Sequence, residues 1–384
     1  MIGSLRLWIK IWAPPPIARA LAALWREVRN LLSSTRRAVR NPVNSILHKY
    51  RLIKLSNNIY HIHGRVSLNY SNDELIVVCV VRNGLIYINS FIKHYFNLGV
   101  KHIVFLDNGS SDDTIKLASA YNSVTVLKTD LPYSKYENVM KDYLVRRFSK
   151  GRWNLCVDID EFFDWPYSGM VKLDALLRYL NVRGYTAVLA QMLDLFSDLP
   201  LSQLRDNPEE DITKNYRYYD ISSIFKCDYR YSRLSTDEIK YHSGGIRKAL
   251  FDTNNGLTKA PLVFVGPRIQ LFKDWHHARN AYIADFTCAL LHYPFTSSFY
   301  DKVREAAATK RFGYVTSDEY DMYWRRLSRE PELCFRLKTS RRYAGIESLL
   351  DEGFLVASPE YLDWVRAYSS DQKTTYGPAT TCDR

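Results

Sequence analysis

The stretch Trp153-Asn154-Leu155-Cys156-Val157-Asp158-Ile159-Asp160-Glu161-Phe162-Phe163 sets the expected fold class of this chain. In this stretch, an apolar run is followed by two aspartates, Asp158 and Asp160, that are two residues apart. On a strand, residues at this spacing share a face, so both carboxylates can point at one ligand. Two carboxylates so close repel each other unless a cation lies between them or one is protonated. The pattern favours a divalent ion that carries a diphosphate, and a solvated turn after a buried strand is the alternative.

The chain before this stretch alternates between strand-like and helix-like patterns. Apolar runs predict strands at 75–81, 103–106, 124–127 and 153–157. Helical periodicity predicts helices at 86–98, 114–120 and 137–148. This alternation is typical of an α/β protein with a doubly wound, mostly parallel sheet, in which ligands bind at the carboxyl ends of the strands. Polar clusters follow three of the strands: Arg82-Asn83, Asp107 to Asp112, and Asp158 to Asp160.

The first two of these clusters offer contacts for a nucleotide. Asp107 ends a strand, where its carboxylate can accept hydrogen bonds from a ribose or a base. Asn108-Gly109-Ser110-Ser111 is a tight polar turn that lets a ligand approach the backbone. Asp112 can contact the ligand or cap the next helix. Arg82, beside Asn83, can pair with a phosphate or clamp Asp107 or Asp112.

Three segments together resemble glycosyltransferase family 2, and in particular its bacterial branch with a D-x-D-E-F motif. They are Val81-Arg82-Asn83, Asp107 to Thr114, and Asp158-Ile159-Asp160-Glu161-Phe162. The resemblance covers residues 74–165 and implies the GT-A fold, with inverting transfer of sugar from a nucleotide diphosphate sugar and Mn²⁺ or Mg²⁺ as cofactor. It implies that Asp107 contacts the nucleoside, that Asp158 faces the ribose or the metal, and that Asp160 is the main metal ligand. Gly84, where the family usually has an acid, and Asp113, where glycine is common, depart from the pattern.

The second half of the chain resembles the same branch more loosely, at Ser243 to Phe251 and at Leu290 to Tyr293 with Phe299 and Lys302-Val303 in the helix beyond. His292 can complete a metal shell, although a single histidine after an apolar run is also a common core residue. Arg247 and Lys248 follow two glycines and can bring cations to a leaving diphosphate, unless they belong to a surface hairpin.

Inverting transfer needs a general base that removes the proton of the acceptor hydroxyl. Asp194, directly after the next apolar strand, is the expected base, although it can equally cap a turn. Glu161, Asp198 and Asp237 are the rivals for this role.

The domain boundaries follow from changes in composition along the 384 residues. We expect a basic amphipathic leader at 1–72 and a GT-A domain at 73–313, with a nucleotide-binding half at 73–165 and an acceptor half at 166–313. A helical extension at 314–368 and a disordered tail at 369–384 complete the expected organisation.

Residues 1–60 carry eleven Lys and Arg and a single Glu, which is +10 of the net charge of +12. A basic amphipathic helix with tryptophans suits an anionic membrane surface, and packing against the domain or a partner is the alternative. We therefore expect a cytoplasmic protein that residues 1–58 attach peripherally to the inner face of the plasma membrane. Nucleic acid is not an expected partner, because no recognition module follows the leader.

The sequence thus predicts a metal-dependent inverting glycosyltransferase that modifies a glycan or lipid-linked acceptor in surface polysaccharide synthesis. A sugar nucleotidyltransferase fits less well, because that chemistry usually brings a glycine-rich basic loop after the first strand. A non-catalytic, membrane-associated scaffold that keeps the fold is the other alternative, and Gly84 favours it.

Overall fold

The computed structural model describes residues 46–267, 269–271, 276–310 and 314–375. The chain divides into two units, residues 1–54 and residues 55–384. In the first unit, the described residues 46–54 are helical. Residues 1–45 of the expected leader and residues 376–384 of the expected tail lie outside the described residues. Within the described part, residues 60–63 of the expected leader form a strand of the central sheet, and residues 369–375 of the expected tail are helical. Along the described part of the chain, no helix has both the length and the apolar character required to cross a bilayer.

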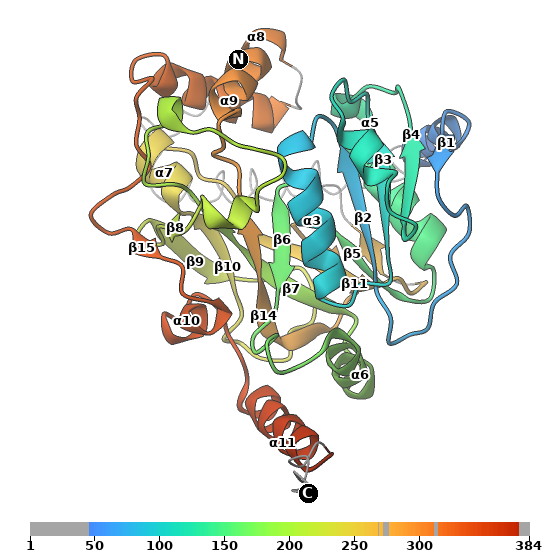
Figure 1. Cartoon of the computed structure of the whole chain (residues 1–384). Helices are drawn as coiled ribbons and strands as arrows, with labels where there is room; N and C mark the ends of the chain where they lie inside the picture. Colours follow the sequence, from blue (N-terminus) through green and yellow to red (C-terminus); the bar gives the residue numbers. More distant parts are fainter. Residues whose placement is uncertain (1–45, 268, 272–275, 311–313, 376–384) are drawn as a thin grey trace, which may run out of the picture. The chain divides into compact units, whose positions relative to one another are not determined.

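A nine-stranded sheet lies at the centre of the second unit (Figure 1), with the order β1-β4-β3-β2-β5-β11-β7-β14-β6. The neighbours β4, β3, β2 and β5 are parallel, and so are β7 and β14. β1, β11 and β6 run antiparallel to their neighbours. The expected α/β class with a mostly parallel sheet is confirmed. The strands are β1 (Tyr60–His63), β2 (Ile76–Val81), β3 (His102–Asp107), β4 (Val124–Lys128), β5 (Trp153–Cys156), β6 (Glu161–Asp164), β7 (Ala187–Asp194), β11 (Thr258–Phe264) and β14 (Ile283–His292).

Three helices of the first half follow the predicted periodicity: α3 (Leu85–Asn97), α4 (Thr114–Ala118) and α5 (Tyr133–Ser149). A fourth helix, α6 (Leu173–Arg183), lies between β6 and β7 and is not among the predicted helices. α5 packs against β2 and β5, and α3 packs against β6 (Figure 1). β2 and β3 are buried along their whole length, which explains their continuous apolar sequence. Gly99, which the periodicity places at the end of the helix, has a φ of 91° that favours glycine.

The expected placement of Asp158 and Asp160 on one face of a strand is wrong. β5 ends at Cys156, and residues 158–160 form a turn into β6. The backbone N–H of Glu161 donates to the carbonyl oxygen of Asp158 at 3.0 Å and closes this turn. Side chains in a turn do not alternate as they do on a strand, so the two carboxylates point to different partners.

The second half wraps the sheet with shorter elements. The segment 197–243, which shows little periodicity, contains the short 3₁₀ helices η1 (Leu201–Gln203) and η2 (Ile212–Lys214) and the strands β8 (Tyr218–Tyr219), β9 (Ile224–Asp228) and β10 (Lys240–Gly244). The short helix α7 (Ile246–Phe251) follows, and β12 (Gln270–Leu271) pairs with β13 (Ala278–Arg279). β15 (Arg341–Arg342) pairs with β8.

The C-terminal part is only partly helical. α8 (Phe299–Thr309) and α9 (Tyr314–Leu327) pack against each other (Figure 1). An irregular segment that contains β15 then leads to α10 (Ile346–Asp351) and α11 (Pro359–Thr375). The expected helical extension thus contains α9, α10 and most of α11, with an irregular segment between α9 and α10.

Candidate functional site

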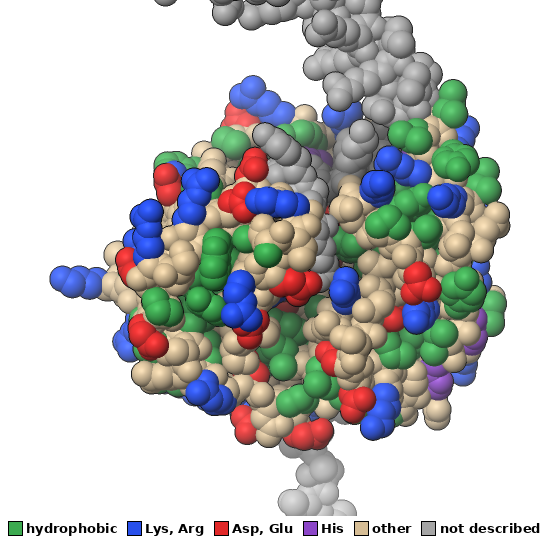
Figure 2. Space-filling model, turned by 90° about the horizontal axis from the view of Figure 1, so that it is seen from above, with side chains coloured by type: hydrophobic (Ala, Val, Ile, Leu, Met, Phe, Trp, Pro, Cys, Tyr) green, Lys and Arg blue, Asp and Glu red, His purple; other side chains and the backbone are tan. Residues whose placement is uncertain are grey.

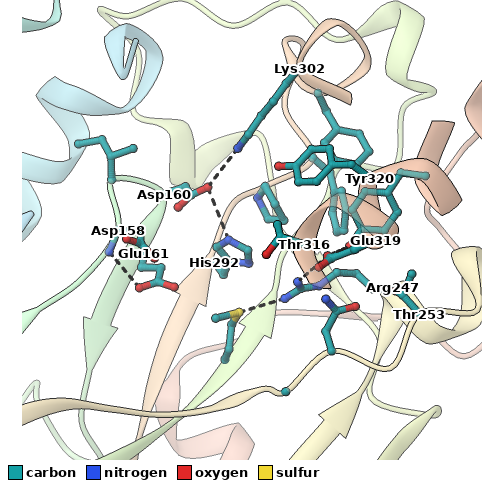
Figure 3. Close-up of a pocket in the computed structure, with 18 of the residues that line it drawn as sticks. Asp158, Asp160, Glu161, Arg247, Thr253, His292, Lys302, Thr316, Glu319 and Tyr320 are labelled. Carbon is teal, nitrogen blue, oxygen red and sulfur yellow. Dashed lines mark hydrogen bonds and ion pairs between the residues drawn. The ribbon is translucent and has the colours of Figure 1, made fainter. Parts of the chain in front are cut away.

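A cavity of about 1040 Å³ opens at the carboxyl ends of β2, β5 and β14. The sequence-predicted residues that line it are Arg82, Asn83, Asp158, Asp160, Arg247 and His292. Lys259 of β11, Lys302 of α8 and Glu319 of α9 also line it. Figure 3 shows Asp160, His292 and Arg247 in sequence across the cavity. The parallel strands thus bring their polar ends together, as expected for this class of sheet.

Asp158 is held by two buried lysines. Its Oδ1 lies 2.8 Å from Nζ of Lys141, and its Oδ2 lies 3.2 Å from Nζ of Lys259. The side chains of the two lysines are only 6% and 10% exposed. Lys259 also donates to Glu161 at 2.5 Å, and Glu161 accepts from the backbone N–H of Asp158 at 3.0 Å. The two buried lysines are thus neutralised by Asp158 and Glu161, and Glu137 lies a further 3.5 Å from Lys141, as buried charges require.

Asp160 faces the opposite way and is held less tightly. Its Oδ2 lies 3.5 Å from Nε2 of His292 and 3.9 Å from Nζ of Lys302. Nδ1 of His292 is 2.6 Å from Oδ1 of Asp194. Arg247 donates two hydrogen bonds to the carboxylate of Asp194, from Nε at 2.7 Å and from a terminal nitrogen at 3.0 Å. A carboxylate on one ring nitrogen directs the other, so Asp194 turns Nε2 of His292 toward Asp160.

These contacts shift the pKa values of the groups. Burial alone would lower the pKa of His292, but the carboxylates of Asp160 and Asp194 outweigh it and raise the pKa to about 9. Burial would raise the pKa of Asp160, but His292 and Lys302 hold it at about 2. Burial opposes ionisation of Asp158 in the same way, yet Lys141 and Lys259 hold its pKa well below the ordinary range. Both aspartates are therefore anionic at neutral pH.

Asp107, Asp112 and Asn83 build the loops beside the cavity. Asp107 accepts from the backbone N–H of Ser110 at 2.9 Å. Asp112 accepts from the N–H groups of Leu85 at 3.3 Å and Thr114 at 3.1 Å, which are the first residues of α3 and α4, whereas the N-cap position of α4 is occupied by Asp113. The side-chain oxygen of Asn83 accepts from the N–H of Ser111 at 2.8 Å. Of these three, only Asn83 lines the cavity.

Arg82 is exposed, lines the cavity and forms no ion pair with any residue that the structure describes, so it does not clamp Asp107 or Asp112. Lys248 pairs with Asp252 at 2.5 Å and does not line the cavity. Arg247 reaches the cavity, but its guanidinium is already engaged by Asp194. Of the three expected phosphate-binding cations, Arg82 alone is available to a phosphate in this arrangement.

The structure leaves no room at position 84 for the acidic side chain that glycosyltransferase family 2 usually has there. A Cβ at this position would lie 2.9 Å from a side-chain carbon of Ile159 and 3.0 Å from one of Val81. Ile159 belongs to the turn that carries Asp158 and Asp160. The missing side chain therefore allows the turn to pack directly on the start of α3.

The expected metal ligands Asp158, Asp160 and His292 do not converge on one point. In the described part of the chain, no group of three or more His, Cys, Asp and Glu side chains is placed to hold a metal ion. Both oxygens of Asp158 accept from lysines, whereas Asp160 and His292 face each other. Mg²⁺ and Mn²⁺ often take one or two protein ligands and complete their shell with water and phosphate oxygens. Asp160 and His292 fit such an ion once His292 has lost its proton, and Asp158 does not.

Several residues of the site escaped sequence reasoning. Lys259 interrupts the apolar strand Thr258–Phe264, and a lone lysine in a buried strand is a signal of a buried partner. Lys141 lies on the buried face of α5, where the same argument applies. The resemblance includes Lys302 but assigns it no role, and Glu319 lies on a helix with an ordinary charge pattern that does not distinguish it.

Comparisons with known proteins give only distant likenesses. No family model matches the chain, and no curated protein matches it by sequence. Among solved structures it is similar to glucosyl-3-phosphoglycerate synthase from Mycobacterium tuberculosis in complex with Mn²⁺, UDP and glucosyl-3-phosphoglycerate, at 17% identity and a TM-score of 0.23, over 35% of this chain and 52% of that one. It is also similar to S. aureus TarS, at 16% identity and a TM-score of 0.31, over 78% of this chain and 53% of that one.

A third similar structure is UDP-glucose pyrophosphorylase complexed with UDP-glucose, at 9% identity and a TM-score of 0.23, over 78% of this chain and 99% of that one. The chain spans about half the length of the first two proteins. At these identities and TM-scores, the likenesses bear on neither activity nor substrate. The chemistry of this chain must therefore be argued from its own residues.

Proposed function

We propose that this chain is a glycosyltransferase of the GT-A type, related to family 2, which transfers a sugar with inversion from a nucleotide diphosphate sugar. The observation that carries the proposal is Asp160, an anionic side chain that faces the cavity beside Lys302. A carboxylate for a divalent ion and an ammonium group for phosphate oxygens are the two partners that a diphosphate needs. The cavity volume of about 1040 Å³ is at the upper end of the range for small-molecule sites and admits a nucleotide sugar.

The donor would lie across the ends of β2 and β5. Arg82 and Asn83 line this side of the cavity, and Arg82 has no competing ion pair with a described residue. Asp160 and His292 are the residues that would hold Mn²⁺ or Mg²⁺. When bound, such an ion supplies positive charge opposite the leaving diphosphate. Asp158, fixed by Lys141 and Lys259, holds the turn in shape, and this arrangement presents Asp160 to the cavity.

Asp194 and Arg247 act on His292 in this proposal. Asp194 does not line the cavity, and its two oxygens are engaged by Arg247 and His292. A carboxylate in this position cannot reach an acceptor hydroxyl, so the expected role of general base does not fit it. It fits a positioning role, in which the imidazole is held with Nε2 toward Asp160.

The acceptor is proposed to be a glycan or a lipid-linked sugar of surface polysaccharide synthesis, used at the cytoplasmic face of the membrane. The support for this is the sequence resemblance and the +10 charge of residues 1–60. Within the proposed domain, the nucleotide-binding half ends at residue 165 and the acceptor half follows it.

Thermal unfolding with a panel of nucleoside diphosphates, with and without Mn²⁺, tests the proposal. We expect one nucleotide to stabilise the wild type by about 2.7 kcal/mol at a concentration of about one hundred times its Kd. The gain should require Mn²⁺ and disappear in Asp160→Ala, since that change removes the cavity-facing carboxylate. Asp130→Ala, at a side chain that is 72% exposed, is the matched control and should keep the gain. No stabilisation by any nucleotide would favour the scaffold alternative instead.

A further inference from the structure

The proposed transfer still lacks a general base, and the following inference rests on that proposed function. Inversion needs a carboxylate or imidazole that faces the acceptor and has an oxygen or nitrogen free to take a proton. Asp194 is excluded by its position behind His292. The base is therefore sought among the carboxylates that line the cavity, because His276 is bonded to the carbonyl oxygen of Thr258 and the ring of His277 packs against aromatic side chains.

Most acidic side chains of the cavity are unsuited to this task. Asp158 and Glu161 are occupied by lysines, and Asp160 belongs to the donor side. The remaining acidic residues of the lining, apart from Glu319, have exposed side chains at its rim: Asp252, Asp301, Glu305 and Asp318. A general base works best where bulk water is excluded from the reacting proton, which favours a partly buried group.

Glu319 meets these requirements. Its side chain is 18% exposed and lines the cavity from α9. Its Oε1 accepts from the hydroxyl of Tyr323 and lies 3.5 Å from a terminal nitrogen of Arg247. Its Oε2 accepts no hydrogen bond and forms no ion pair with any residue that the structure describes. One oxygen thus anchors the carboxylate, and the other is left for a proton.

Two unsatisfied polar atoms lie in the loop between α7 and β11, which lines the same cavity as Glu319. The hydroxyl oxygen of Thr253 and the side-chain oxygen of Asn255 are buried without a hydrogen-bond partner among the described residues. Thr253 is 5% exposed, and both residues line the cavity. Buried polar atoms are rarely left unsatisfied, so these two are suited to the hydroxyl groups of a bound sugar. Figure 3 shows Thr253, Arg247 and Glu319 on one side of the cavity, with His292 between this group and Asp160.

We propose that Glu319 is the general base of the transfer, and that Thr253 and Asn255 bind the acceptor sugar beside it. The acceptor hydroxyl gives its proton to Oε2 of Glu319, and its oxygen forms the new bond to the anomeric carbon of the donor. The bond between that carbon and the diphosphate oxygen breaks, and the nucleoside diphosphate leaves with the electron pair. Arg247 contacts both Glu319 and Asp194, and so links the acceptor side to the residues that position His292.

Steady-state release of nucleoside diphosphate tests this assignment. The probes are UDP-glucose, UDP-N-acetylglucosamine, GDP-mannose and dTDP-rhamnose, each with octyl glycosides or water as acceptor. Glu319→Gln keeps an oxygen for Tyr323 and should lower kcat by about 10²–10⁴-fold, with the donor KM and the nucleotide-dependent thermal shift unchanged. Glu319→Asp should recover part of the rate.

Two further variants separate a chemical role from a structural one. Asp321→Asn alters an acidic side chain of the same helix that does not line the cavity, and it should leave kcat unchanged. Thr253→Val keeps the shape of the side chain and should raise the KM for an octyl glycoside about tenfold, with kcat little changed. If the wild type binds nucleotide and Glu319→Gln turns over at the wild-type rate, the assignment of Glu319 is overturned and the proposed glycosyltransferase function is retained. If no nucleotide stabilises the wild type, both the proposed function and the assignment of Glu319 are overturned.

Discussion

At the scale of single residues, the site is governed by what it costs to bury a charge. Lys141 and Lys259 would be strongly disfavoured in the interior without partners, and so would Asp158 and Glu161. Together the lysines and carboxylates form contacts of 2.5–3.2 Å, in which each charge lies beside one of the opposite sign. The consequence is that Asp158, which the motif marks as a metal ligand, has no oxygen free for a metal in this arrangement. Asp160, whose contacts are 3.5 and 3.9 Å, remains accessible to a ligand.

Asp164 of β6 provides a test of buried charge away from the catalytic groups. Burial raises its pKa to about 6, and Glu347 adds to the effect. The folded state therefore holds a proton that the unfolded chain loses at lower pH, so stability is lost as the pH rises from about 4 through 6. Asp164→Asn keeps the oxygen that accepts from the N–H of Trp165 at 2.8 Å.

We expect Asp164→Asn to raise the free energy of unfolding at pH 8 by up to about 3 kcal/mol, and to have little effect at pH 4. Urea denaturation at the two pH values measures this, with Asp130→Asn as the exposed control. A gain of equal size at both pH values would contradict the argument.

At the scale of elements, the C-terminal helix α11 is an integral part of the core. Tyr361 is fully buried, its ring stacks on Phe286 with centroids 4.2 Å apart, and its hydroxyl donates to the carbonyl oxygen of Pro166 at 2.8 Å. Trp364, one turn further on, contacts Tyr179 of α6 with ring centroids 4.6 Å apart. The helix thus ties α6 and β14 together, although its contact residues are far from both in sequence.

Removal of the ring of Tyr361 should be among the costlier single changes in this protein. We expect Tyr361→Ala to lower the free energy of unfolding by about 3–5 kcal/mol, because a large cavity replaces the stacked ring. Tyr361→Phe should cost about 1 kcal/mol, because it removes only the hydrogen bond to Pro166. Chemical denaturation measures both, and Glu360→Ala at an exposed site of the same helix is the control. A loss below 1 kcal/mol for Tyr361→Ala would show that α11 does not stabilise the fold.

At the scale of the whole molecule, charge is distributed unequally. Residues 1–60 carry +10, and the remaining residues carry +2. The face seen in Figure 2 shows Lys and Arg side chains interspersed with Asp and Glu. The attraction for an anionic surface is therefore expected to come from the N-terminal region, and the attraction for a diphosphate from the few cations inside the cavity.

Binding of the full chain to anionic vesicles checks the proposed membrane contact. Replacement of Arg36, Arg37 and Arg40 by Gln should weaken binding to phosphatidylglycerol vesicles about a hundredfold, since each basic residue near the surface contributes about 1 kcal/mol. Replacement of Arg325, Arg326 and Arg329 in the second unit is the matched control and should have little effect. Binding of the wild type should also fall as salt is added. Equal binding of the two triple variants would contradict a specific contribution of the leader.

The sequence by itself determined the α/β class and the positions of β2 to β5 with their helices. Apolar runs and helical periodicity are local properties of the sequence, so they can be read without the tertiary structure. The continuous apolar runs of β2 and β3 correspond to strands that are buried on both faces. It also indicated which polar clusters meet at the carboxyl ends of the strands, because parallel strands bring these ends to one edge. Six of the ten residues named in advance for the site line the cavity for this reason.

Only the tertiary structure decided how the charges pair. Lys259 is 101 residues from Asp158, and His292 is 98 residues from Asp194. These pairs exist because β11 inserts beside β5 and β14 lies beside β7, and the order of strands in a sheet leaves no trace in local periodicity. The same sheet order leaves Asp160 facing the cavity and places Asp194 behind His292. Coulomb interactions and desolvation act through space, so the ionised pairs follow from the packing of distant elements.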